Sequence, residues 1–389
     1  MSMKTTVHQL KVAIKNALVA VNAKTCQLHM SADQLQVKAS TFAGYVRVSV
    51  EATGFTEREV IGCFNGAATN ALFASLDPST EVTISALADG LRLRFGGASI
   101  KLKNSESDGS IDSLFEAANG CSGHDLVADT TGSDLIKAFQ SVQNYAAQND
   151  VRSFLCGVHM SVRDGMLCLT ATNGFMLNDV NTGIPSSIAS ISVIVPSAAS
   201  KAIDMVVQPS EKVQLFLSGE RDAQKVILKT GRLCWVSSLI VGQFPDCARL
   251  YEGEHLGEVS DWVVSAKELA IAVQRIAAIS GKPFVKLRAK SETVTVLSEE
   301  GDHKVDVRSS DAIERGLLRY QPSEWEATFS PDYLHEIAQS VPTEFMLLRK
   351  GRSTDAKLYV RPVHVEGGPA ADWMALLQSA KGEGERSGA

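Results

Sequence analysis

With 389 residues the chain is too long for one hydrophobic core, so two or three domains are expected. Hydrophobic residues make up 44% and charged residues 21%, which excludes a disordered chain, and no apolar run is long enough to span a membrane. The net charge of −6 argues against an open nucleic-acid binder, because such proteins present a basic face to the phosphates. Any contact with DNA must come from a locally basic surface, and a protein that never meets DNA fits the same charge.

The N-terminus lacks the apolar core of a signal peptide, so a cytoplasmic location is expected. The seven cysteines form no C-x-x-C pair, and several lie within apolar alternations such as Met166-Leu-Cys-Leu. This usage is typical of buried, reduced thiols. We therefore expect no disulfide framework, no metal site and no cofactor.

Helical periodicity follows a capping signal in six segments. Thr6 with Gln9 and Ser265 with Glu268 have the spacing of a capping box, and proline stands at the first helical position after Ser330. The expected helices run from about His8 to Val21, Gly66 to Leu76, Ser133 to Gln148, Ala198 to Val207, Ser265 to Ser280, and from Ser330 to the residue before Pro342.

Alternating strands follow each helix, for example in the ranges 81–85, 91–95, 158–162, 166–170, 213–217, 226–229, 285–288, 294–297, 345–348 and 358–360. Short polar links such as Arg163-Asp-Gly indicate hairpin turns. After a shorter first interval, the helix caps recur about every 65 to 68 residues. A unit of one helix and several antiparallel strands, present six times, predicts an α+β protein of three similar domains.

Glycine-containing polar stretches place the domain boundaries, giving domains at 1–123, 124–255 and 256–366. The composition of residues 367–389 predicts a flexible C-terminal tail with one short apolar turn, Trp373-Met-Ala-Leu-Leu. That turn has the apolar spacing of a peptide that could bind in a pocket of the same chain, whereas a loosely packed extension is the simpler interpretation.

No residue pattern indicates catalysis. His335-Glu336 resembles the start of a zinc-protease motif, but Gln339 stands where the second histidine is required. The histidines and acids show no cluster that would pair a nucleophile with a base. We therefore expect a non-catalytic protein.

Charge differs between the expected helices and the rest of the chain. The helices carry about one net positive charge, whereas the whole chain is at −6. This distribution favours helices that face phosphate, although a solvated mixed-charge face predicts nearly the same count.

Several spaced motifs resemble the bacterial sliding clamp, the beta subunit of the replicative DNA polymerase III holoenzyme. These are Asn149-Asp-Val-Arg-Ser-Phe-Leu-Cys-Gly-Val, Leu167-Cys-Leu-Thr-Ala-Thr-Asn-Gly-Phe-Met-Leu, Ser237-Ser-Leu-Ile-Val-Gly-Gln-Phe-Pro-Asp and Leu358-Tyr-Val-Arg-Pro-Val. The resemblance covers residues 1 to about 366 and implies a head-to-tail homodimer that closes a ring, with helices lining the hole. A ring needs only weak, sequence-independent contacts with double-stranded DNA. The implied partners are the replicative polymerase, the clamp loader and other proteins with a clamp-binding motif, and no membrane.

The resemblance also implies a peptide pocket between domains two and three. Its positions correspond to Leu155, Thr172, Gly174, Phe175, Met176, Leu177, Pro245, Arg249, Leu250, Val360, Pro362 and Val363. Phe175, Met176, Arg361, Val363 and Cys247 depart from the family's residues, so the pocket is expected in altered form. Plain core residues would show the same apolar pattern. Such divergence suits a clamp encoded by a phage or mobile element.

Positional matching to the family implies DNA contacts at Lys24, Gln148, Asn149 and Lys201, although each fits a solvated surface group equally well. The alternative function is a clamp-like scaffold, or a mimic that binds partner proteins without encircling DNA. The altered pocket and the acidic charge keep this alternative open.

Overall fold

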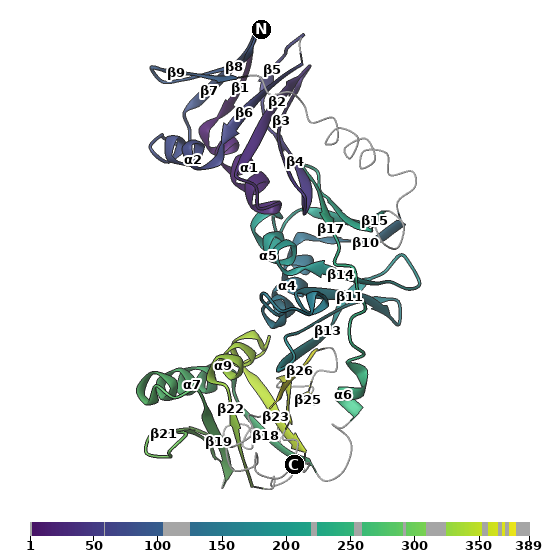
Figure 1. The fold of residues 1–389 in the computed structure, drawn as a ribbon, viewed down its shortest axis with the longest axis vertical. Coiled ribbons are helices and arrows are strands. Elements are labelled where there is room, and N and C mark those ends of the chain that lie inside the picture. Colours follow the sequence, from purple (N-terminus) through teal and green to yellow (C-terminus); the bar gives the residue numbers. More distant parts are fainter. Residues whose placement is uncertain are drawn as a thin grey trace. The chain divides into compact units, whose positions relative to one another are not determined.

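The computed structural model describes residues 2–57, 59–103, 125–218, 224–252, 259–290, 293–308, 324–351, 357–364, 368–369 and 373–378. Within them it has helices and antiparallel sheets, so the expected α+β class is confirmed (Figure 1). Among the described helices, none is long and apolar enough to cross a bilayer. Part of the expected tail, including 379–389, lies outside the described residues.

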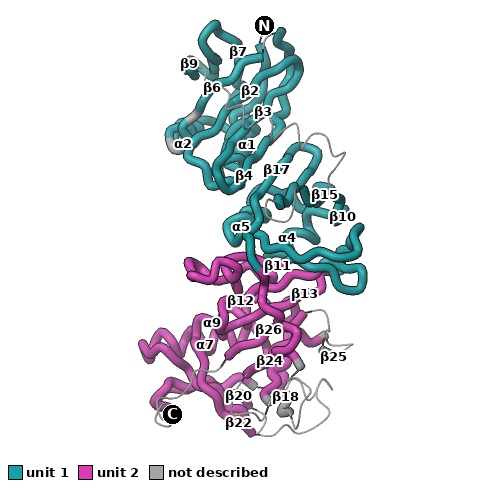
Figure 2. The backbone as a smooth tube through the Cα atoms, turned by 45° about the vertical axis from the view of Figure 1, so that its right-hand side comes forward, with its two compact units in different colours: residues 1–140, 160–167, 183–242 teal, residues 141–159, 168–182, 243–389 magenta. Residues whose placement is uncertain are grey.

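Two compact units divide the chain (Figure 2). Unit 1 comprises residues 1–140, 160–167 and 183–242, and unit 2 comprises 141–159, 168–182 and 243–389. Three strands have residues in both units, namely β11 (Gly157–Arg163), β12 (Met166–Thr172) and β13 (Met176–Pro185). The division into three domains stays a prediction.

Unit 1 contains two complete sheets. The first has the strand order β5 (Thr53–Gly54), β1 (Ser2–Thr6), β7 (Glu81–Leu87), β8 (Gly90–Phe95) and β9 (Ala98–Lys103). The second has the order β10 (Asp125–Thr131), β15 (Lys212–Ser218), β16 (Lys225–Lys229), β17 (Leu233–Ser238), β4 (Gly44–Val50), β3 (Gln34–Thr41), β2 (Thr25–Ser31) and β6 (Val60–Asn65). Strand β14 (Ser192–Pro196) also lies in unit 1.

The β17–β4 pair joins two sequence-distant halves of the second sheet. Val236 lies opposite Tyr45, and both are buried. A side chain cannot fit at Gly44, because a Cβ there would come 2.2 Å from the Val236 carbonyl oxygen. Glycine thus permits the close approach that makes one sheet from strands almost 200 residues apart.

The helices of unit 1 begin close to the expected caps. They are α1 (Val7–Ala20), α2 (Gly66–Ala74), α4 (Gly132–Val142), whose last two residues belong to unit 2, and α5 (Ser197–Val206). Thr6 and Gln9 form the expected capping box of α1, in which the Thr6 hydroxyl accepts from the Gln9 N–H at 3.2 Å. The apolar side of α1 is buried through Leu10, Ile14 and Ala17, which leaves Lys11 and Lys15 exposed.

A polar network holds the end of α5. The Arg232 guanidinium donates to the Val206 carbonyl at 2.6 Å and lies 2.9 Å from the Glu211 carboxylate. Glu211 in turn accepts hydrogen bonds from the Thr230 hydroxyl and the Gln208 N–H. The last carbonyl of a helix has no partner within the helix, and Arg232 supplies one here.

Unit 2 contains the helices α6 (Ala248–Glu252), α7 (Ala266–Ser280) and α9 (Pro331–Ser340). Ser265 caps α7 by accepting from the Glu268 N–H, and Gly281 ends the helix with a left-handed φ of 58°, so both expected boundaries are confirmed. One of its sheets has the order β21 (Lys304–Arg308), β20 (Thr293–Ser298), β19 (Val285–Lys290) and β22 (Trp325–Phe329).

The other sheet of unit 2 corrects the interpretation of the C-terminus. Next to β13 it has the order β26 (Trp373–Gln378), β24 (Lys357–His364), β23 (Phe345–Gly351) and β18 (Val259–Ser265), with β25 (Gly368–Pro369) paired to β24. The expectation of a flexible tail with one apolar turn is wrong at 373–378, because these residues form a strand between two others. Trp373, Leu376 and Leu377 are buried in this strand. So apolar a segment can be buried because pairing with β13 and β24 satisfies the backbone N–H and C=O groups on both of its edges.

The third expected helix is shorter than its periodicity indicates. Helix α4 ends at Val142, and a 3₁₀ turn follows over Gln143–Tyr145. Tyr145 is fully buried, and its hydroxyl lies 2.5 Å from that of Ser340. Packing of Tyr145 against α9 therefore overrides the helical period.

Candidate peptide-binding surface and DNA-contacting residues

A tight loop joins β12 to β13, and four of the expected pocket positions lie in it or at the strand ends that flank it. The buried Thr172 hydroxyl donates to the Met176 carbonyl at 2.8 Å and accepts from the Gly174 N–H at 3.0 Å. The Asn173 side-chain oxygen accepts from the N–H groups of Phe175 and Met176, both at 2.9 Å. Gly174 has a φ of +91°, which disfavours any residue with a side chain. Side-chain bonds thus hold this loop in one conformation.

We expect Thr172→Val to destabilise the chain by about 1–3 kcal/mol, because the loop then loses both hydrogen bonds of the buried Thr172 hydroxyl. Urea denaturation measures the change in free energy of unfolding. Thr83→Val on β7 is the matched control, since both residues lie on a strand. An equal effect of the two substitutions would contradict the role given to the Thr172 hydroxyl.

An ion pair lies beneath the loop. The Arg152 guanidinium is 2.8 Å from the Asp150 carboxylate, and a Cβ at Gly174 would lie 3.4 Å from the same guanidinium. Hydrogen bonds from Arg152 lower the pKa of Asp150 to about 2. The pair therefore stays charged at any physiological pH. Leu155, the next expected pocket position, is buried in the 3₁₀ turn Ser153–Leu155.

Phe175 is exposed at the tip of the loop. Its ring stacks on Tyr333 of α9, with 6.0 Å between ring centroids and 17° between ring planes. Its carbonyl accepts a hydrogen bond from the Gln378 N–H at 2.9 Å. The loop thus binds the end of β26 directly.

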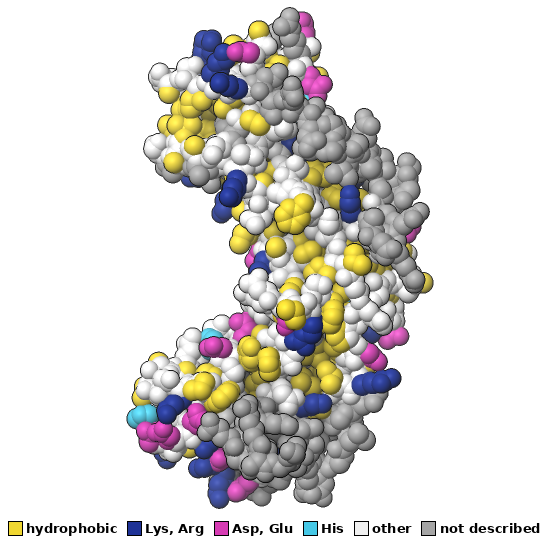
Figure 3. All heavy atoms as spheres, in the orientation of Figure 1, with side chains coloured by type: hydrophobic (Ala, Val, Ile, Leu, Met, Phe, Trp, Pro, Cys, Tyr) yellow, Lys and Arg dark blue, Asp and Glu magenta, His cyan; other side chains and the backbone are white. Residues whose placement is uncertain are grey.

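An apolar cluster lies on one face of the β13–β26–β24 sheet, and we call it the 177/359/376 cluster. It contains the buried Leu177, Leu376 and Tyr359, with Cys247, Tyr251 and Met374 packed against it. Leu376 pairs in register with Leu177 on one side and with Tyr359 on the other. On the face that Figure 3 draws, hydrophobic side chains gather over the sheet of unit 2.

The segment around α6 borders this cluster. The Tyr359 hydroxyl donates to the Leu250 carbonyl at 3.1 Å. Pro245, Arg249 and Leu250 are exposed, and Arg249 lies 3.6 Å from Asp246. Burial raises the pKa of the Cys247 thiol to about 11, with the nearby Asp179 and Asp246 carboxylates adding to the shift. The α6 segment, with its exposed Arg249 and Leu250, therefore lies beside the apolar cluster.

Register separates the expected pocket residues onto two faces. Residues opposite one another in a ladder share a face, and successive residues alternate. Met176 pairs with Leu377, and Val360 pairs with Ala375, so both lie on the face opposite Leu177. Pro362 shares that opposite face by alternation, and Val363 belongs to another core cluster with Val263, Phe345 and Leu347. Met176, Val360, Pro362 and Val363 are buried and pack in the core.

Sequence reasoning missed Tyr359, Tyr251, Met374 and Leu376 as members of this surface. For Tyr359 a signal existed, because in the alternating segment Leu358-Tyr-Val the tyrosine points away from its neighbours. For Met374 and Leu376 the apolar spacing of the tail was the signal. A pairing with β13, almost 200 residues away in sequence, has no local sign.

The residues expected to contact DNA lie at the surface. Lys24 is exposed in the loop between α1 and β2, and its carbonyl accepts from the Gly66 N–H that begins α2. Lys201 is half-buried on α5. Gln148 and Asn149 are exposed, but they lie in a loop beyond the 3₁₀ turn and not at the end of a helix, which corrects that expectation. Asn149 has a φ of 58°. Their contact with DNA stays a prediction.

The helices of unit 1 carry more basic than acidic side chains. Lys11 and Lys15 on α1, Lys137 on α4 and Lys201 on α5 form no ion pair among the described residues. Asp134 accepts from the Thr131 hydroxyl, and Asp204 accepts from Gln140 at 3.4 Å. Within the described ranges, these helices thus carry lysines that no acidic side chain neutralises.

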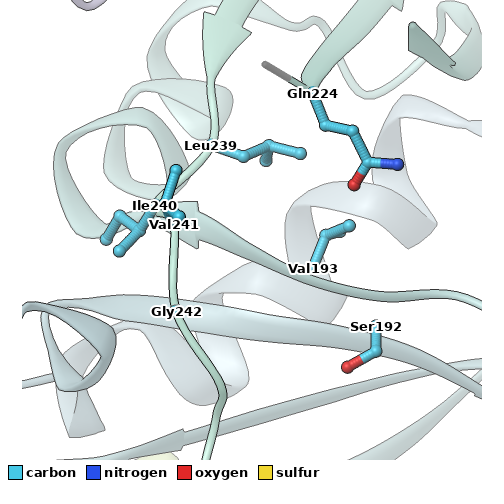
Figure 4. Close-up of a pocket in the computed structure, with 7 residues that line it drawn as sticks. All are labelled: Ser192, Val193, Gln224, Leu239, Ile240, Val241 and Gly242. Carbon is cyan, nitrogen blue, oxygen red and sulfur yellow. The ribbon is translucent and has the colours of Figure 1, made fainter. Parts of the chain in front are cut away.

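A separate cavity of about 290 Å³ lies in unit 1, where the side chains of Val193, Gln224 and Leu239 converge (Figure 4). The loop at Ile240 is held to β14 by a hydrogen bond from its N–H to the Ile194 carbonyl at 2.9 Å. None of the expected pocket residues lines this cavity. Within the described ranges, no three His, Cys, Asp or Glu side chains come together in a metal-binding group, and the cysteines there are free thiols.

Similarity in sequence to known proteins covers the central part of the chain, and similarity in fold covers nearly all of it. Residues 130–246 match the family of the DNA polymerase III beta subunit, central domain. The beta sliding clamp of Staphylococcus epidermidis is 23% identical over 193 residues, which are 48% of this chain and 49% of that protein. The chain therefore spans about half the length of the curated relatives it matches.

Solved structures extend the likeness. The DNA polymerase sliding clamp from Pseudomonas aeruginosa gives a TM-score of 0.79 at 18% identity, covering 98% of this chain and 99% of that one. The DNA polymerase III beta subunit from Thermotoga maritima gives 0.77 at 16% identity, with 98% and 99% covered. The chain thus has the fold of these sliding clamps, and its residues 130–246 match the family of the DNA polymerase III beta subunit, central domain.

Proposed function

We propose that this chain is a DNA polymerase processivity factor, a non-catalytic sliding clamp that closes a ring around double-stranded DNA as a homodimer. The match of residues 130–246 to the central domain of the beta subunit carries this proposal. The likeness in fold over 98% of the chain supports it, because the fold extends well beyond the matched domain.

Threading explains how an acidic protein stays on DNA. A protein that grips phosphates needs a strongly basic face, whereas a closed ring is held by topology and needs only weak contacts. Lys24 and the unpaired lysines on the helices of unit 1 supply such contacts in this proposal. Weak, sequence-independent contacts also permit sliding.

The 177/359/376 cluster and its rim form the partner site in this proposal. An apolar floor with few polar groups suits short apolar peptides, which we assign to the replicative polymerase, the clamp loader and other clamp-binding proteins. We infer that the protein acts in the cytoplasm, where bacterial DNA replication takes place.

Trapping on a linear duplex tests the ring. The protein is incubated with a duplex carrying biotin at both ends, streptavidin then blocks the ends, and gel filtration measures the protein that remains bound. We expect retention that depends on both blocked ends and is lost when a restriction enzyme cuts the duplex. Light scattering should give twice the chain mass of 41.7 kDa.

Two results would overturn the proposal. Retention that is indifferent to cutting would indicate an open DNA binder. A monomer that is retained under no condition would indicate the clamp-like scaffold or mimic.

A further inference from the structure

Strand β26 occupies the centre of the surface assigned above to partner peptides. It pairs with β13 from Met176↔Leu377 to Val180↔Trp373, and with β24 from Lys357↔Gln378 to Val360↔Ala375. Leu376 and Met374 of this strand contribute to the 177/359/376 cluster. An extended apolar segment therefore already lies where an extended apolar peptide would bind.

Contacts from the β12–β13 loop and from the α6 segment, the two rims of the 177/359/376 cluster, hold β26 in place. The Gln378 N–H donates to the carbonyl of Phe175 in the β12–β13 loop, and the Tyr251 hydroxyl of α6 donates to the Met374 carbonyl at 3.5 Å. Both rims belong to the surface at which partner binding was expected. The strand thus contacts the β12–β13 loop, the α6 segment, and the Leu177 and Tyr359 members of the cluster.

One buried polar group of β26 and one of its neighbour β13 have no hydrogen-bond partner among the described residues. The indole N–H of Trp373 is buried without a hydrogen-bond partner among the described residues. The side-chain oxygen of Asn178, opposite Ala375, is likewise unpaired. An unpaired buried polar group disfavours the state that contains it. A peptide without a tryptophan at that position would form the same ladder without this penalty.

We propose that residues 373–378 are an internal occupant of the partner site, and that partner peptides bind by replacing this strand through addition to β13 and β24. The proposal rests on the peptide-binding role assigned under the proposed function. Strand replacement preserves the backbone hydrogen bonds of both neighbours, because one extended segment exchanges for another. The short link from His364 to Trp373 keeps the internal strand at high effective concentration, so only partners that bind tightly or at several points displace it.

Peptide binding to a shortened chain tests this inference. The chain is ended after Ala370, which keeps β25, and a fluorescent peptide with the sequence of residues 371–379 is titrated by anisotropy. A second peptide, Ala-Asp-Phe-Leu-Ala-Leu-Phe-Gln-Ser, and a scrambled version complete the set. We expect the first two peptides to bind the shortened chain about a hundredfold more tightly than the full chain. Equal affinities for the two chains would overturn the inference.

A disulfide lock provides a test in the full chain. Lys357 and Gln378 are register partners at the end of β26, and both are half-buried, so Lys357→Cys with Gln378→Cys can join the strand to β24. We expect residual binding of the phenylalanine peptide in the reduced protein and none after oxidation. Binding that is unchanged by oxidation would contradict displacement of the strand.

The Cys247 thiol reports the same event without a ligand. A pKa of about 11, against an ordinary 9.0, slows alkylation because the thiolate is the reacting form. We expect iodoacetamide to label Cys247 up to about a hundredfold faster in the shortened chain, as read by peptide mass mapping. If the shortened chain does not fold, the full-length variant Leu376→Asn is tested in its place. A Cys247 labelling rate and a peptide affinity that are both unchanged in this variant would overturn the inference. The same variant is also tested for retention on end-blocked DNA. Normal retention shows that the proposed clamp function stands even where the inference about residues 373–378 fails.

Discussion

Replacing Lys24 and Lys201 together by glutamate is expected to weaken retention on DNA by about a hundredfold at physiological salt. Each lysine that contacts phosphate releases counterions, so removing one should lower the slope of log affinity against log salt by about 1. In a homodimer both subunits carry the two substitutions, so each lysine–phosphate contact is lost once in each subunit. Titration of a fluorescent duplex at several salt concentrations gives both the affinity and the slope.

A matched charge reversal keeps this test specific. Lys4 and Lys101 also belong to unit 1, but they lie on strands and pair with Glu81 and Asp89. Reversal of these two changes the net charge by the same amount away from the helices. If both double variants lose affinity equally, the effect comes from total charge, and the assignment of Lys24 and Lys201 is wrong.

Leu377→Ala is expected to lower the free energy of unfolding by about 2–5 kcal/mol. Leu377 is completely buried between Met176 and Leu358, so truncation leaves a cavity in the middle of a sheet. Urea unfolding followed by tryptophan fluorescence measures the change.

The neighbouring Gln378→Ala is the control, because its half-buried side chain contributes little and its backbone N–H is retained. We expect that substitution to change stability by no more than about 0.5 kcal/mol. A Leu377→Ala variant as stable as the control would restore the interpretation of residues 373–378 as a loose tail.

Local signals in the sequence were sufficient for most of the fold. The capping residues Thr6 and Ser265 predicted where α1 and α7 begin, and Gly281 predicted where α7 ends. Turn chemistry at Asp164 and Gly165, whose φ angles are 52° and 74°, predicted the β11–β12 hairpin. These features depend on interactions within a few residues, so the sequence alone determined them.

Only the tertiary structure decided which residues form the candidate peptide surface. The order of residues does not show which face of β24 holds Val360 and which holds Tyr359, because register with β26 sets this and a shift by one residue exchanges the faces. Likewise, nothing near Trp373 in sequence indicates a strand. Its segment is ordered by β13 and β24, and glycine and proline before it are equally typical of a tail. Burial of an apolar strand between two distant edges is a long-range effect, and a pattern read along the chain cannot contain it.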